Sequence, residues 1–133
     1  MIDHVSVAVR DLDRADRFYQ ALLAAVGYER LVVRSGTVGF GKSYPEFWIN
    51  LRAGMASAAE DSGAEGSGAH VALRVRTADL VRAFHAAALG AGGSCDGAPG
   101  PRPQHGQGGY YAAFVRDPDG NRIEAVTFLT GQG

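Results

Sequence analysis

The chain has 133 residues, of which 46% are hydrophobic and 20% charged, so it is long enough to bury a core as one domain or as two small fused modules. Its net charge of −1 excludes the basic surface that nucleic-acid binding requires, and no apolar run is long enough to span a membrane. The first residues carry no basic stretch followed by an apolar one, so we expect a cytoplasmic protein. Cys95 is the only cysteine, which excludes an internal disulfide and a thiolate zinc cluster.

The first part of the chain predicts a strand, a helix and three further strands. Its first segment alternates, with Val5, Val7 and Val9 on one face and His4 on the other, as is typical of a half-buried strand. The apolar residues that follow recur at helical spacing until Gly27, which is suited to end a helix. In chain order, these predicted elements occupy residues 2–10, 14–26, 28–34, 37–41 and 46–52.

A stretch rich in Gly, Ala and Ser comes next and shows neither the helical nor the strand period, so we interpret it as a linker or surface loop. A strand then begins again, followed by a helix that Thr77 caps. The predicted strand, helix, short strand and loop of this part lie at residues 69–76, 78–89, 94–96 and 97–109, with two more strands after them. The chain thus divides into a first module, a linker and a second module, at residues 1–53, 54–68 and 69–133.

The two modules are an internal repeat. The segment His4-Val5-Ser6-Val7-Ala8-Val9 returns about 66 positions later as His70-Val71-Ala72-Leu73-Arg74-Val75, with His in the same place. Each copy opens the same predicted order of strand, helix and three strands. The sequence therefore predicts an α+β fold made of two βαβββ modules.

The last two strands flank the turn Asp117-Pro118-Asp119-Gly120-Asn121. Proline presets φ, aspartate accepts hydrogen bonds from nearby backbone, and Gly120 tolerates positive φ, so this stretch predicts a hairpin loop. Alternation then places Glu124 on one face of the last strand, next to Val126 and Phe128. A carboxylate among apolar neighbours needs a partner, because an unpaired buried charge is costly.

The repeat, the His in each first strand, and the stretch from Asp117 to Glu124 together resemble the vicinal oxygen chelate superfamily of glyoxalases, bleomycin-resistance proteins and extradiol dioxygenases. The resemblance covers essentially the whole chain. It implies that the modules form a cup-shaped mixed sheet, and that a divalent metal is held between them by side chains of their first and last strands. By this resemblance His4, His70 and Glu124 match three metal ligands, and the protein is expected to be a homodimer.

The chemistry of these three residues agrees with the resemblance. Two neutral imidazoles and one carboxylate form a facial triad that leaves coordination positions open. Fe, Mn, Ni and Zn all suit such a set, and spacing does not choose among them. A single strand histidine is more often structural, so the joint pattern carries this interpretation. Whether the three residues meet within one chain or across two chains stays open.

Further side chains are candidates for the site. The resemblance to glyoxalase I implies a fourth ligand in the last strand of the first module, where Glu46 is the only carboxylate and lies at the strand's start. The three-ligand pattern is more similar to fosfomycin-modifying transferases and extradiol dioxygenases. Glu46 is therefore a candidate fourth ligand or base, and His105 a candidate base on a loop. The candidates for substrate contact are Trp48, Arg102, Tyr110 and Phe114.

Two functions follow as hypotheses. The first is a metal-dependent enzyme of glyoxalase or dioxygenase type, which acts on a small substrate that chelates the metal through vicinal oxygens. The second is a non-catalytic protein that binds a small molecule in the same cup without metal, as bleomycin-resistance proteins do. The complete set of three ligand types favours the first hypothesis, because a metal-free binder has no need of it.

Overall fold

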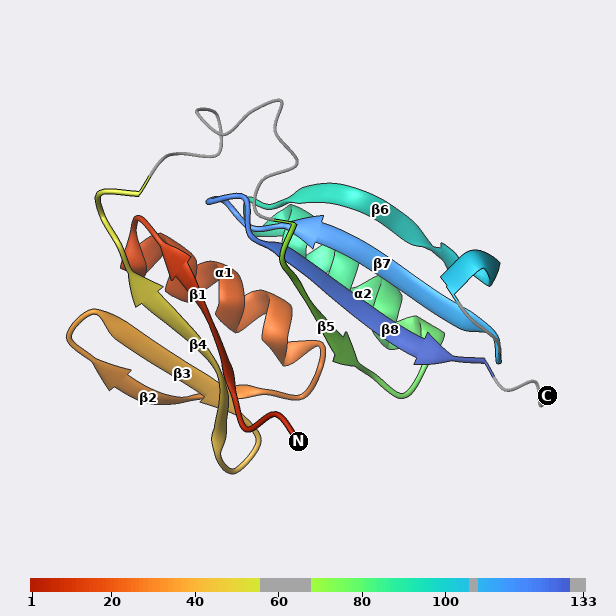
Figure 1. Ribbon diagram of the computed structural model, residues 1–133, viewed down its shortest axis with the longest axis horizontal. Helices are drawn as coiled ribbons and strands as arrows, with labels where there is room; N and C mark the ends of the chain where they lie inside the picture. The colour runs from red at the N-terminus through yellow and green to blue at the C-terminus, as the bar shows by residue number, and fades with distance from the viewer. Residues whose placement is uncertain (56–67, 106–107, 130–133) are drawn as a thin grey trace.

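The computed structural model describes residues 1–55, 68–105 and 108–129, which form two modules of one helix and four strands each (Figure 1). The first module contains β1 (Val5–Val9), α1 (Leu12–Ala24), β2 (Glu29–Arg34), β3 (Thr37–Gly41) and β4 (Pro45–Leu51). The second contains β5 (His70–Arg74), α2 (Ala78–Gly90), β6 (Ser94–Pro101), the 3₁₀ turn η1 (Pro103–His105), β7 (Tyr110–Arg116) and β8 (Arg122–Phe128). The predicted α+β class and the repeated βαβββ order are confirmed.

Both sheets have the same topology. Their strand orders are β1-β4-β3-β2 and β5-β8-β7-β6, so the first strand of each module lies at a sheet edge beside the last strand. These two neighbours run parallel, and the other pairs are antiparallel. The internal repeat in sequence is thus a repeat in topology.

The core lies between each sheet and its helix. Helix α1 packs on the first sheet, α2 packs on the second, and the two helices also contact each other. Asp11 and Thr77 cap the helices by accepting hydrogen bonds from Arg14 N and Leu80 N. One continuous cluster of buried side chains runs through both modules, because α1 and α2 bring their apolar faces together.

Strand β6 is longer than the sequence predicts. The sequence predicts a strand at residues 94–96 and a loop after it, whereas β6 continues to Pro101. Its pairing with β7 shifts register on both sides of Gly97, as at β-bulges. An edge strand with bulges tolerates the proline and glycine residues that conceal this element in the sequence. The predicted linker at residues 54–68 lies largely outside the described residues.

No helix in the described ranges is long and apolar enough to cross a membrane.

The predicted turn after β7 is present. Asp117 Oδ1 accepts hydrogen bonds from the backbone N–H groups of Asp119 and Asn121, both at 2.8 Å. Gly120 adopts a φ of 91°, which a residue with a side chain rarely does, and its N–H reaches Asp117 O at 2.9 Å. The turn is therefore held by its own aspartate, as the sequence indicates.

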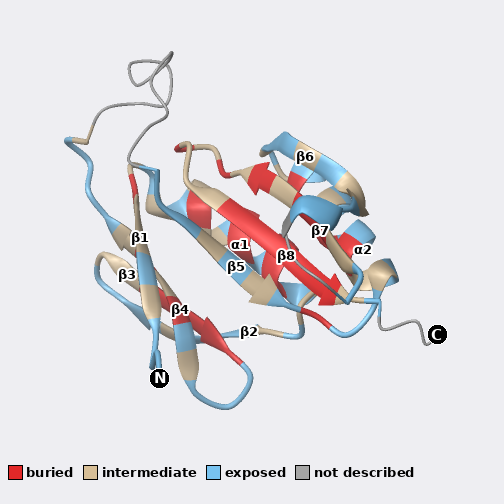
Figure 2. Ribbon diagram, turned by 45° about the vertical axis from the view of Figure 1, so that its right-hand side comes forward, coloured by how far each residue is buried: buried red, intermediate tan, exposed pale blue. Residues whose placement is uncertain are grey.

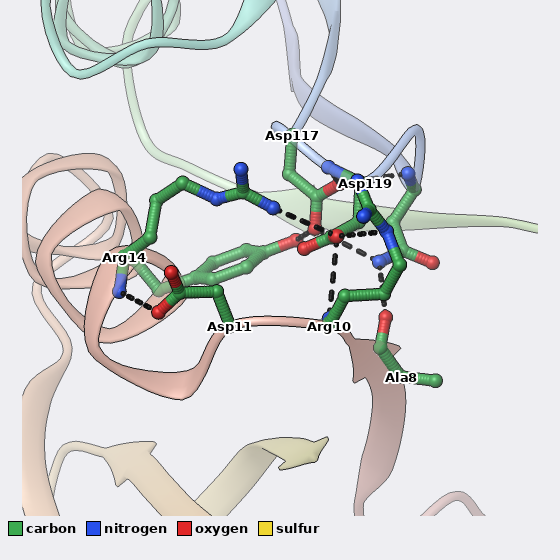
Figure 3. A network of polar contacts seen from close by, with 8 residues as sticks. Ala8, Arg10, Asp11, Arg14, Asp117 and Asp119 are labelled. Atoms are coloured by element: carbon green, nitrogen blue, oxygen red, sulfur yellow. Dashed lines mark hydrogen bonds and ion pairs between the residues drawn. The ribbon is translucent and has the colours of Figure 1, made fainter. Parts of the chain in front are cut away.

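The same turn also binds the first module, through what we call the inter-module network (Figure 3). Asp119 is buried and accepts from Arg14 Nη2 at 3.0 Å and from Arg10 N at 3.2 Å. Tyr19 Oη donates to Asp117 Oδ2 at 2.6 Å, and Asn121 Nδ2 donates to Ala8 O at 2.8 Å. The network comprises Ala8, Arg10, Arg14, Tyr19, Asp117, Asp119 and Asn121. It joins the start of β8 to the corner between β1 and α1.

The pKa of the Asp117 carboxyl is raised above its ordinary 3.8, because its removal from water outweighs its hydrogen bonds from Tyr19, Asn121 and Asp119. The folded state therefore retains a proton that the unfolded state has released, so the stability that Asp117 contributes decreases as pH rises through its folded pKa. We expect the free energy of unfolding of wild type, relative to Asp117→Asn, to decrease as the pH rises above the ordinary pKa of 3.8. Urea unfolding of both proteins across this range measures the difference. An increase with pH would mean that the hydrogen bonds outweigh burial.

Candidate functional site

Glu124 is a nearly inaccessible carboxylate in the middle of β8, with 2% of its surface exposed. Its strand is buried along most of its length, between β5 and β7 (Figure 2). His70 Nε2 lies 3.1 Å from Glu124 Oε1, and Tyr110 Oη donates a short hydrogen bond to Oε2. Both carboxylate oxygens thus have partners, as the apolar neighbours of this residue in the sequence require.

The pairing of strands brings these side chains to one face. Glu124 lies opposite Ala72 on β5 and opposite Phe114 on β7. Alternation therefore places His70 and Tyr110 on the same face as Glu124, while Ile123 and Ala125 belong to the core on the other face. The register therefore puts Tyr110 and Phe114 on the same face as Glu124.

Tyr110 remains a hydrogen-bond donor at neutral pH. Burial, and after it the bond to Glu124, raises the pKa of Tyr110 to about 12. Its ring contacts Phe128 edge to face, with the centroids 5.4 Å apart. The tyrosine can therefore hold one oxygen of Glu124 in a constant orientation while the other oxygen faces His70.

Arginine side chains lie on aromatic rings near this face. The Arg102 guanidinium is 5.5 Å from the centroid of the Phe114 ring, and Arg74 is 4.4 Å from that of Phe128. Arg102 also donates to the backbone oxygens of Ala98 and Pro101. The two cations are thus positioned by neighbouring groups, which reduces the entropy lost when they bind a ligand.

Trp48 lies on β4 of the first sheet, whereas Glu124 lies on the second sheet. Its ring covers Gly39, where an added Cβ would lie 2.8 Å from the indole. The guanidinium of Arg34 is 5.6 Å from the centroid of the ring. Trp48 is therefore a side chain of the first module's sheet, and any site that includes both Trp48 and Glu124 must span the two sheets.

His4 is separated from the other two predicted ligands. It precedes β1, is exposed, and its Nδ1 lies 2.7 Å from Asp3 Oδ1. Asp3 also accepts a hydrogen bond from Tyr44. Among the described residues, no three His, Cys, Asp or Glu side chains of one chain are grouped to hold a metal ion. The structure therefore brings His70 and Glu124 together and leaves His4 in the other module.

The two candidate bases lie on other elements, Glu46 on β4 and His105 on η1. Glu46, exposed near the start of β4, accepts a hydrogen bond from Tyr28, and burial followed by this bond raises the pKa of Tyr28 to about 12. His105 is the last residue of η1. No pattern in the sequence identifies Tyr28 as the partner of Glu46. Arg74 shares the alternation of His70 in β5, so the sequence pattern does contain a signal for it.

The sequence model of the Glyoxalase/Bleomycin resistance protein/Dioxygenase superfamily matches residues 1–125. No curated protein matches the chain.

Several solved structures are similar over nearly the whole chain. A glyoxalase/bleomycin resistance protein from Albidiferax ferrireducens is 32% identical with a TM-score of 0.78, over 94% of this chain and 97% of that one. A glyoxalase/bleomycin resistance protein/dioxygenase family enzyme from Burkholderia phytofirmans is 19% identical with a TM-score of 0.70, over 96% and 98%. The fosfomycin resistance protein FosX from Mesorhizobium loti is 21% identical with a TM-score of 0.65, over 96% and 91%. The similarity to the Burkholderia and Mesorhizobium proteins shows a shared fold alone.

Proposed function

Because the chain belongs to the glyoxalase/bleomycin resistance protein/dioxygenase superfamily, we propose that it is a divalent-metal-dependent enzyme. Its substrate is a small molecule that chelates the metal through oxygens on neighbouring carbons. The observation that carries this proposal is the contact of His70 with the buried carboxylate of Glu124. An imidazole and a carboxylate at this separation are two suitable ligands for Fe, Mn, Ni or Zn.

The third ligand in this proposal is His4 of a second copy of the chain, so the enzyme is a homodimer. Two features support it. Within the described part of one chain no group of three such side chains forms, and His4 is exposed beside the edge strand β1. His70 likewise begins the edge strand of the second sheet. Edge strands are free to approach another copy without disturbing the core.

When bound, the metal supplies a Lewis acid for a developing enolate or alkoxide, or a position for O₂ if it is iron. Tyr110 orients Glu124 by bonding one of its oxygens, the task of an outer hydrogen-bond partner at metal sites. Phe114 and Trp48 form apolar walls, and Arg102 contacts an anionic part of the substrate. Glu46 and His105 are the proposed proton-transfer groups.

The alternative function is binding of a small molecule without metal. It is favoured by the fact that both oxygens of Glu124 already have hydrogen-bond partners within the chain. A satisfied carboxylate requires no cation for stability.

Elemental analysis distinguishes the two functions. Protein purified without an affinity tag and without added metal should contain close to one transition-metal ion per chain, and His70→Ala should lose most of it, since removal of one of three ligands greatly weakens affinity. Arg82→Gln, an exposed substitution on α2, is the control and should retain the metal. If wild type and His70→Ala carry equally little metal, the binding function replaces the enzyme.

A further inference from the structure

A pocket of about 200 Å³ lies between the two modules, and its lining includes neither His70 nor Glu124. Residues from the end of α1, from the turn after β3, from β4 and from β5 line it. They are Val26, Tyr28, Lys42, Glu46, Leu73 and Arg74. At about 30 Å³ for each water molecule in the liquid, the pocket holds a small organic molecule rather than one ordered water.

The charged groups of the pocket are not matched to one another. Neither Lys42 nor Arg74 forms an ion pair within the described residues. Glu46 already accepts the hydrogen bond of Tyr28. The pocket is therefore lined by two cations and one anion, so one further negative charge would balance it.

Arg74 is positioned by a neighbouring ring, and Lys42 is exposed. The Arg74 guanidinium lies 4.4 Å from the centroid of the Phe128 ring. The end of the Lys42 stem lies near Gly27, where an added Cβ would be 3.6 Å from Lys42 Cε, an ordinary contact distance. A cation that is already positioned loses less freedom when an anion binds.

We propose that this pocket binds a small monocarboxylate, with its carboxylate on Lys42 and Arg74 and its carbon chain on Val26 and Leu73. A guanidinium fork matches the two oxygens of a carboxylate, and the ammonium group adds a third donor. The excess of one positive charge in the pocket favours a ligand with one negative charge, since Glu46 would repel the second charge of a dianion. The apolar side chains favour a ligand with a hydrocarbon body over an inorganic anion. This inference does not depend on the proposed metal function.

Titration of the full-length protein with butyrate, followed by NMR of the Val26 and Leu73 methyl groups, tests the proposal. EDTA is present, so that metal plays no part. Butyrate should shift both signals to saturation in the millimolar range, and its uncharged isostere butyramide should not. Lys42→Gln and Arg74→Gln should each weaken binding about tenfold, the effect of one charge-assisted hydrogen bond.

Arg17→Gln is the matched control, because it removes an exposed arginine of α1 that does not line the pocket. It should leave the affinity for butyrate unchanged. Lys42 and Arg74 are exposed, so their variants should keep the wild-type backbone spectrum, which shows that they fold. The proposal is overturned if neither methyl signal shifts, if butyramide acts as butyrate does, or if both pocket variants bind as tightly as wild type. None of these results would change the metal content.

Discussion

Co-expressed chains carrying His4→Ala and Glu124→Gln are expected to form heterodimers that recover about half of the wild-type metal content, although each variant alone contains little. If a site takes His4 from one chain and His70 with Glu124 from the other, the two defects fall in the same site of the heterodimer. The other site then has all three wild-type ligands. Differently tagged subunits allow the heterodimer to be purified, and elemental analysis after tag removal gives its metal content.

The matched control pairs His70→Ala with Glu124→Gln. Both residues belong to the second module and lie 3.1 Å apart, so each site of this heterodimer has one defect and no metal should be recovered. If all three ligands came from one chain, the first pair would also fail. Recovery in neither heterodimer, with wild type fully loaded, would contradict the shared site while leaving metal dependence intact.

Asp117→Ala is expected to lower the free energy of unfolding by about 3 kcal/mol, a large part of the total for a domain of this size. The substitution leaves the buried Tyr19 hydroxyl and the backbone N–H groups of Asp119 and Asn121 without their acceptor. Relief from burying the carboxylate offsets part of this loss, since the pKa of Asp117 is raised. Equilibrium urea unfolding at neutral pH measures the change, with the m-value checked for constancy.

Asp96→Ala is the control for this prediction. Asp96 also accepts contacts from arginines, with Arg116 Nε at 3.4 Å and Arg122 Nε at 4.0 Å, but 30% of its side chain is exposed. Surface pairs of this kind contribute less than about 1 kcal/mol. The loss in the free energy of unfolding for Asp117→Asn should lie between those for Asp117→Ala and Asp96→Ala, because asparagine keeps an oxygen for the backbone N–H groups of the turn. Equal losses for Asp117→Ala and Asp96→Ala would mean that the inter-module network adds no stability.

In the inter-module network, the local turn can be predicted from the sequence, but its contacts with the first module cannot. The sequence of the stretch from Asp117 to Glu124 predicts a turn followed by a ligand, and the turn itself follows from local chemistry. Its second role, in which Asp119 binds Arg14 and Asn121 binds Ala8 O, joins residues more than a hundred positions apart. No short-range pattern carries that information, because it depends on how the modules pack.

In the candidate site, too, some contacts follow from strand alternation and others only from how the elements pack. Alternation accounts for Tyr110, Phe114 and Glu124 lying on one face once the register of β7 and β8 is known. It could not identify Tyr28 as the partner of Glu46, since the helix and strands between them decide that contact. Nor could it place His4 relative to His70: equal positions in a repeat predict equal positions in each module, and not the distance between modules.

The amino-acid order by itself determined the repeated βαβββ modules, the helix caps, the turn at Gly120 and the face on which Glu124 lies. These features depend on backbone periods and on contacts a few residues long, which are encoded where they occur. Only the tertiary structure decided that Glu124 contacts His70 and Tyr110 while His4 remains beside Asp3. It did so because these distances are set by the packing of α1 against α2 and by the docking of the Asp117–Asn121 turn, which bring distant segments together.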